Sequence, residues 1–264
     1  QSVECLFYNS PLVAQVNVHK QVADSQGENA EPGRDWTVGA TARATSGTVT
    51  SSPNQGTQQT DNDGTASWSF RFGASEDKAT LNVSELMQDG YEFANGTCEV
   101  TRLDGTTSST ELTGPDENPA VKIVPGDVVD CTIVNSVKSA TVSLGKQMLD
   151  SNGENPQPVE GWTVGATLAS GSTSGVSIST PATAQTEADG QVATPWVVDF
   201  PTDRNATGHV TVKEVMQDGY EFASAVCVIT SDSGATAEQS IDSDTGTLTG
   251  LKPGDAAECT FTNK

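Results

Sequence analysis

Short stretches of the chain alternate apolar and polar residues with the two-residue period of a β-strand. Residues 16–20 place Val, Val and Lys at every second position, and residues 81–85 place Leu, Val and Glu in the same way. Residues 142–146 and 210–214 repeat these two patterns. Asp-Gly pairs such as Asp63-Gly64 and Asp189-Gly190 lie between the alternating stretches and indicate turns. No stretch shows apolar residues recurring every three to four positions, the pattern of an amphipathic helix. The pattern therefore predicts an all-β protein.

The chain also repeats itself, which predicts two tandem domains. Trp36–Thr41 and Trp162–Thr167 both read WTVGAT, and Met87–Ala94 and Met216–Ala223 are identical. A Pro-Gly-Asp turn followed by Cys-Thr-x-x-Asn closes each repeat. We expect domains at residues 11–136 and 139–264, each an Ig-like or transthyretin-like sandwich of about seven short strands.

The first residues resemble the end of a repeat. Residues 3–10 read like residues 129–136, so residues 1–10 are interpreted as the last strand of a preceding repeat, within a longer array. Cys5 is then expected to have lost its partner with the body of that repeat.

Composition narrows the function classes. The formal net charge is −22 and the pI is near 4.1, which excludes binding of nucleic acid through a basic surface. No apolar stretch approaches the ~20 residues that a transmembrane helix needs, so we expect no membrane insertion.

The cysteines occupy matched positions in the two repeats. Cys98 and Cys131 in the first correspond to Cys227 and Cys259 in the second, which indicates one disulfide per repeat and an oxidising compartment. Such a bond is expected to stabilise each domain by roughly 3–4 kcal/mol. Two buried free thiols per repeat are the alternative, and a metal site is the weaker one because no further ligands lie close in sequence.

Each repeat places three polar residues on the apolar faces of its strands. Period-two counting turns Lys20, Glu85 and Asn135 inward in the first repeat, and it does the same in the second for Lys146, Glu214 and Asn263. Buried Lys and Glu are costly unless they are paired. In the alternative interpretation, the lysines reach the surface and the asparagines cap strand ends. Recurrence of all three residues favours the buried cluster.

This pattern resembles the CnaB-type domains of Gram-positive surface proteins and pilins. The resemblance rests on Val-x-x-x-Lys, Glu-x-x-x-x-Gly-Tyr and Cys-Thr-x-x-Asn, and it covers both repeats almost entirely. It implies two tandem CnaB-type β-sandwiches, each with an intramolecular isopeptide bond, Lys20–Asn135 and Lys146–Asn263. It also implies that Glu85 and Glu214 transfer the protons during bond formation. The added disulfide departs from the family pattern.

General chemistry agrees with this expectation. Burial is expected to lower the pKa of the lysine, which frees the amine to attack the asparagine carbonyl carbon. Burial is expected to raise the pKa of the glutamate, which can then polarise that carbonyl and relay protons while ammonia leaves. The reaction runs once per domain, so we expect neither an enzyme nor a cofactor.

Taken with the resemblance, these features predict a structural stalk or spacer of an extracellular, cell-wall-attached adhesin or pilin that resists force and proteolysis. The expected partners are neighbouring repeats of the chain, and a host surface protein or glycan reached through other regions. Two rival functions remain: a module that itself binds a host protein or glycan, and an accessory sandwich of a secreted carbohydrate-active enzyme.

The remaining signals have structural interpretations. Trp36 and Trp162 are expected in the core, and His19 and His209 lack counterparts, which argues against catalytic or metal-binding roles. Acidic loops, at residues 61–64 and 150–154, could hold Ca²⁺ but do not complete a twelve-residue ligand loop, so no metal is expected.

Overall fold

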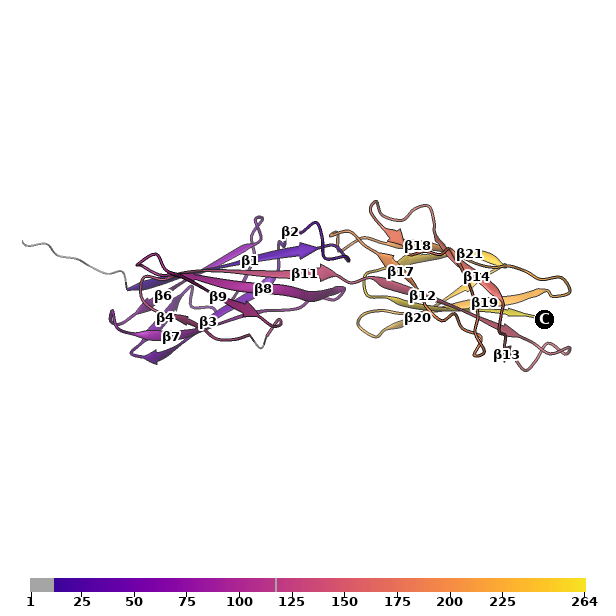
Figure 1. Cartoon of the computed structure of the whole chain (residues 1–264), viewed down its shortest axis with the longest axis horizontal. Helices are drawn as coiled ribbons and strands as arrows, with labels where there is room; N and C mark the ends of the chain where they lie inside the picture. The colour runs from indigo at the N-terminus through magenta and orange to yellow at the C-terminus, as the bar shows by residue number, and fades with distance from the viewer. Residues whose placement is uncertain (1–11, 117) are drawn as a thin grey trace, which may run out of the picture. The chain divides into compact units, whose positions relative to one another are not determined.

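The computed structural model describes residues 12–116 and 118–264, which form two compact units (Figure 1). Unit 1 comprises the described parts of residues 1–22, Ala30–Met87 and Phe93–Asn135, and unit 2 comprises Ala23–Asn29, Gln88–Glu92 and Ser136–Lys264. The predicted strand at residues 1–10, with Cys5, lies outside the described residues. The predicted boundaries at 11–136 and 139–264 stay a prediction.

The first repeat forms two sheets. The larger has the strand order β4-β6-β1-β11-β8-β9, with β2 beside β1, and the smaller has the order β10-β7-β3-β5. The strands are β1 (Val13–Ala23), β2 (Glu31–Pro32), β3 (Thr37–Ser46), β4 (Val49–Ser52), β5 (Thr57–Gln59), β6 (Thr65–Phe72), β7 (Lys78–Glu85), β8 (Tyr91–Thr101), β9 (Thr107–Leu112), β10 (Val121–Ile123) and β11 (Val128–Val137).

The second repeat forms an equivalent pair of sheets. The larger has the order β15-β17-β12-β22-β19-β20, with β13 beside β12, and the smaller has the order β16-β14-β18-β21. The strands are β12 (Ala140–Met148), β13 (Gln157–Pro158), β14 (Thr163–Leu168), β15 (Ser177–Ile178), β16 (Thr183–Gln185), β17 (Trp196–Asp199), β18 (Gly208–Glu214), β19 (Phe222–Thr230), β20 (Thr236–Ile241), β21 (Thr245–Leu251) and β22 (Ala256–Asn263).

The all-β sandwich prediction is confirmed. Each repeat has eleven strands within the described residues, more than the seven or so expected, because short loop segments such as β2 and β13 pair alongside the long strands. Among the described residues, no helix has the length and apolar character needed to cross a membrane.

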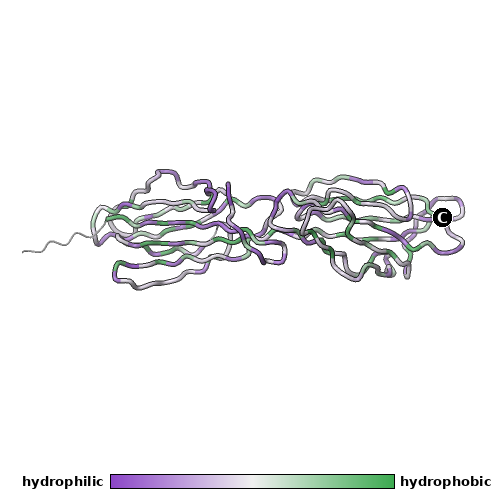
Figure 2. Tube along the Cα trace, turned by 90° about the horizontal axis from the view of Figure 1, so that it is seen from above, coloured by the Kyte–Doolittle hydropathy of each residue, from purple (hydrophilic) through white to green (hydrophobic). Residues whose placement is uncertain are grey.

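The core of each unit follows the pleat of its strands. In β7 the buried positions are Ala79, Leu81, Val83 and Glu85, every second residue, and the residues between them face outward. Hydrophobic positions recur along the strands, and hydrophilic residues dominate the loops (Figure 2). The predicted core tryptophans are buried, with Trp36 4% and Trp162 2% exposed.

The first and last long strands of each repeat lie next to each other. In the second repeat β12 and β22 are parallel neighbours, with Lys146 opposite Phe261 and Met148 opposite Asn263. In the first repeat β1 and β11 are likewise neighbours, and their arrows point the same way in Figure 1. A residue near the end of one strand therefore lies close to a residue near the end of the other.

Each last strand carries a disulfide to its other neighbour. Cys227 on β19 faces Cys259 on β22 in the antiparallel register, and the two sulfurs are bonded. Cys98 on β8 and Cys131 on β11 are bonded in the same way. The disulfide fixes the last strand against the strand on the side away from β1 or β12.

Candidate functional site

The three predicted polar residues of each repeat come together in the core. In unit 2, Lys146 on β12 and Asn263 on β22 belong to the larger sheet, and Glu214 ends β18 of the smaller sheet. Asn263 lies two residues beyond Phe261, which is opposite Lys146, so both side chains point to the same face. The side chains of Lys146 and Glu214 are fully buried, and Asn263 is 0% exposed.

One glutamate oxygen contacts both other groups. Lys146 Nζ lies 2.7 Å from Glu214 Oε2, and Asn263 Nδ2 donates a hydrogen bond of 3.1 Å to the same oxygen. A single carboxylate oxygen therefore stands between the amine and the side-chain amide.

Unit 1 reproduces this arrangement with its own three residues. Lys20 Nζ lies 2.9 Å from Glu85 Oε2, and Asn135 Nδ2 donates to that oxygen at 3.1 Å. Lys20 lies on β1, Asn135 on β11 and Glu85 at the end of β7. Two independent repeats thus build the same cluster from the same elements.

The buried groups are incompletely satisfied. Among the described residues, Glu214 Oε1, Asn263 Oδ1 and their counterparts in unit 1 have no hydrogen-bond partner, and both lysine Nζ atoms make an ion pair without hydrogen-bond geometry. Buried polar atoms without partners are costly and rare. Their coincidence at one place in each unit marks a site rather than ordinary core packing.

Burial also changes the acidity of the amines. Loss of solvent lowers the pKa of Lys20 to about 8, against the attraction of Glu85, which raises it. Burial lowers the pKa of Lys146 for the same reason, and Glu214 again opposes the shift. A lysine with a lowered pKa releases its proton more readily and becomes a nucleophile.

A tryptophan lies over each amine. Lys20 Nζ is 4.5 Å from the ring centroid of Trp36, and Lys146 Nζ is 4.7 Å from that of Trp162. Buried threonines hold the tryptophans in place. Trp162 N donates to Thr186 Oγ1 at 3.1 Å, and that hydroxyl donates at 2.5 Å to the backbone carbonyl of Val159, which lies 27 residues earlier in the chain.

The Asp-Gly turns support the lysine strands. Lys146 N donates to Gly190 O at 2.7 Å, and Lys20 N donates to Gly64 O at the same distance. Gly190 has a φ of +78°, and a Cβ atom there would lie 2.6 Å from Lys146 O. Only glycine combines this conformation with so close an approach.

Sequence reasoning did not identify two methionines that contact the site. Met87 Sδ and Met216 Sδ each lie 3.4 Å from the asparagine Nδ2 of their own unit. Both methionines begin the eight-residue segment that is identical in the two repeats, Met87–Ala94 and Met216–Ala223. This identity was the one sequence feature that could have pointed to them.

The orientation of the asparagine differs from the expected one. The expectation was a glutamate that polarises the amide carbonyl, but the structure places Nδ2 against the carboxylate. An amide N–H donates and a carboxylate oxygen accepts, so this orientation gives Oε2 of each glutamate a hydrogen-bond donor.

The other sequence signals have local structural roles. His19 Nδ1 lies 3.0 Å from Thr65 Oγ1, and its Nε2 lies 3.6 Å from Asp130 on the adjacent strand. Asp150 Oδ1 accepts from two backbone N–H groups of its own loop, those of Asn152 and Glu154. Within residues 12–116 and 118–264, no group of three or more His, Cys, Asp or Glu is placed to hold a metal ion.

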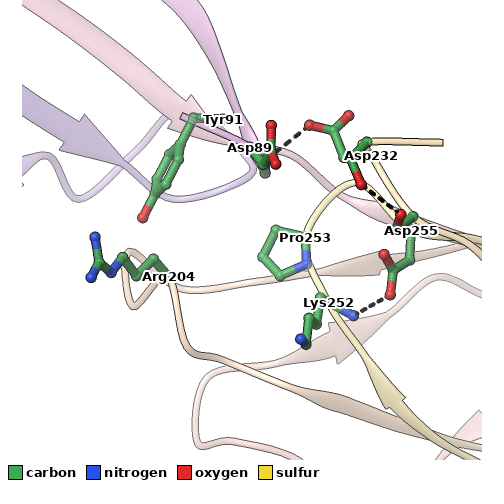
Figure 3. Close-up of a pocket in the computed structure, with 10 residues that line it drawn as sticks. Asp89, Tyr91, Arg204, Asp232, Lys252, Pro253 and Asp255 are labelled. Atoms are coloured by element: carbon green, nitrogen blue, oxygen red, sulfur yellow. Dashed lines mark hydrogen bonds between the residues drawn. The ribbon is translucent and has the colours of Figure 1, made fainter. Parts of the chain in front are cut away.

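The repeated Pro-Gly-Asp motif shapes a turn. Asp255 Oδ2 accepts from Lys252 N at 2.8 Å beside Pro253 in the pocket of Figure 3, and Asp127 accepts from Val124 N at 2.8 Å in unit 1. Burial raises the pKa of Asp255, and the hydrogen bond from Lys252 opposes that shift. These aspartates direct the chain into β22 and β11.

Comparison with known proteins gives structural likenesses only. No family model and no curated protein matches the chain. The major pilin of Streptococcus pyogenes matches at 15% identity over 97% of this chain and 99% of that one, with a TM-score of 0.33. The minor pilin GBS52 of Streptococcus agalactiae matches at 12% identity over 95% of each chain, with a TM-score of 0.28. The basal pilin SpaE of Lactobacillus rhamnosus GG matches at 10% identity over 80% of this chain and 84% of that one, with a TM-score of 0.28. These TM-scores are too low to support an argument about the site, so the description of the fold and the site rests on the strands and contacts given above.

The Asp-Gly turn gives a testable contact. We predict that Gly190→Ala destabilises unit 2 more than Gly153→Ala, which also has a positive φ but has no atom within 4 Å of the added Cβ. Gly153→Ala is expected to cost about 1–2 kcal/mol from backbone strain. Gly190→Ala is expected to cost at least about 1 kcal/mol more, because the lysine strand must shift. Urea unfolding measures both, and equal costs would contradict the proposed support of Lys146.

Proposed function

We propose that each repeat is a self-locking spacer domain in which the lysine and asparagine form an isopeptide bond. The observation that carries this proposal is the shared glutamate oxygen, within 2.7–2.9 Å of the amine and 3.1 Å of the amide nitrogen in both units. An atom in that position can accept a proton from one nitrogen and deliver it to the other.

The reaction balances without any co-reactant. Lys146 transfers a proton to Glu214, and the neutral amine attacks Cγ of Asn263. The new Nζ–Cγ bond forms as the Cγ–Nδ2 bond breaks, and the departing nitrogen receives a proton through the glutamate. Of the three ammonium hydrogens, one stays on the new amide and one leaves in ammonia. The third remains on the carboxyl group or leaves as part of an ammonium ion.

The surroundings favour the product. The reactants place an ammonium and a carboxylate inside an apolar sandwich, where charges are expensive even when paired. The product is a neutral amide, and ammonia can escape to water. Each domain carries out this step once, so we infer self-modification rather than enzymatic turnover.

The strand order suggests a mechanical role. The bond would join adjacent strands, the first and the last of each repeat. In a stalk pulled from its ends, tension would enter and leave each domain through these two strands. The disulfide fixes the last strand to its other neighbour. We propose a stalk or pilus segment on the surface of a Gram-positive cell, attached to the wall, because disulfides persist outside the cytoplasm and the sequence pattern resembles that class.

Mass spectrometry tests the chemistry. We predict that the intact, fully reduced chain is lighter than its sequence by two ammonia molecules, and that Glu85→Ala and Glu214→Ala each remove the deficit of their own unit. Gln1 at a free N-terminus can also lose ammonia by cyclising, so peptide mapping must find Lys20 joined to Asn135 and Lys146 to Asn263. The exposed residues Glu99 and Glu238 supply matched alanine controls that keep both bonds. A chain of unmodified mass would contradict the proposal.

Single-molecule pulling tests the mechanical role. With the bond between residues 146 and 263, unit 2 is expected to lengthen very little when pulled from its ends under reducing conditions. In Lys146→Ala the segment between these residues is free to extend, by roughly 400 Å at about 3.3–3.6 Å per residue. Equal extension in both proteins would show that force does not pass through the bond.

A further inference from the structure

Each asparagine amide nitrogen has a second neighbour besides the glutamate. Met87 Sδ lies 3.4 Å from Asn135 Nδ2, and Met216 Sδ lies 3.4 Å from Asn263 Nδ2. The asparagines are 0% exposed, whereas both methionines are partly exposed. The thioether therefore contacts the reacting group from a residue that also reaches the surface.

A thioether sulfur accepts hydrogen bonds weakly and donates none. It can contact an amide N–H group favourably, but a carbonyl oxygen in the same place would face another acceptor. The glutamate Oε2 makes the same distinction while it is ionised. The two acceptors together favour one of the two orientations of the asparagine carboxamide.

This orientation matters for the proposed reaction. The nitrogen is the leaving group, and it must receive the proton that the glutamate has taken from the lysine. A carboxamide turned by 180° would place its oxygen against Oε2 and move the leaving nitrogen away from the proton donor.

We propose that Met87 and Met216 are positioning residues that hold the leaving nitrogen of the asparagine against the glutamate. This inference rests on the proposed isopeptide reaction. A methionine that only fills space would be equally well replaced by an isosteric hydrocarbon. A methionine that orients the amide would not, because its sulfur accepts a hydrogen bond from the amide nitrogen and a methylene group does not.

Norleucine separates these roles because it replaces the sulfur by a methylene and keeps the chain length. The protein contains three methionines, so cell-free synthesis with norleucine changes Met87, Met148 and Met216 together. We expect the loss of ammonia, followed by intact mass and peptide mapping over time, to slow about fivefold or more in both units. Met148 lies opposite Asn263 on β12, and Met148→Leu, expected to react at the normal rate, isolates its contribution.

A site-specific variant provides the second arm. Met216→Leu is expected to slow bond formation in unit 2 several-fold and to leave unit 1, an internal reference in the same chain, unchanged. Val215→Ala, at the neighbouring exposed position, is the matched control and should react normally. In a Lys146→Ala background, which cannot form the bond, Met216→Leu should leave the unfolding midpoint nearly unchanged.

The outcomes distinguish this inference from the proposed function. If the norleucine protein forms both bonds at the normal rate, the positioning role is overturned and the isopeptide reaction stands. If Met216→Leu clearly lowers the unfolding midpoint in the Lys146→Ala background, lost packing explains the slower reaction. The methionine is then a packing residue and the inference fails. If the unsubstituted chain loses no ammonia, the proposed function fails, and the positioning role fails with it.

Discussion

Burial of a lysine amine against a glutamate carboxylate is the constraint on which each unit depends. A buried ion pair is tolerable only while both partners remain, and removal of one typically costs 3–5 kcal/mol. The side chains of Lys146 and Glu214 are fully buried, and Glu214 also accepts the hydrogen bond of Asn263. The strands that carry these residues must therefore keep their register, and a neutral amide between lysine and asparagine would remove the cost of the charges.

The sandwich supplies this cluster from both layers. The lysine and asparagine come from neighbouring parallel strands of the larger sheet, and the glutamate comes from the facing sheet. The disulfide lies on the same last strand, with Cys259 four residues before Asn263 and pointing to the same buried face. In unit 2 a disulfide thus links β22 to β19 on one side, and the proposed amide bond would link it to β12 on the other.

Much of this arrangement could be predicted from the sequence because strand alternation has a simple phase. Counting by two from Val142 places Lys146 on the core face, and counting from Val210 does the same for Glu214. The contact of Met216 with Asn263 could not be found this way, because Met216 lies beyond the end of β18 and its direction depends on the local chain path. The amide orientation was also beyond the sequence, since it depends on which acceptors surround the side chain.

An electron-density map of the site would show directly whether the lysine and the asparagine are joined. We expect continuous density between Lys146 Nζ and Asn263 Cγ at the length of an amide bond, about 1.33 Å, with no density for the original Asn263 Nδ2. The same is expected at Lys20 and Asn135. Separate side chains at van der Waals distance in both units, with the asparagine amides intact, would contradict it.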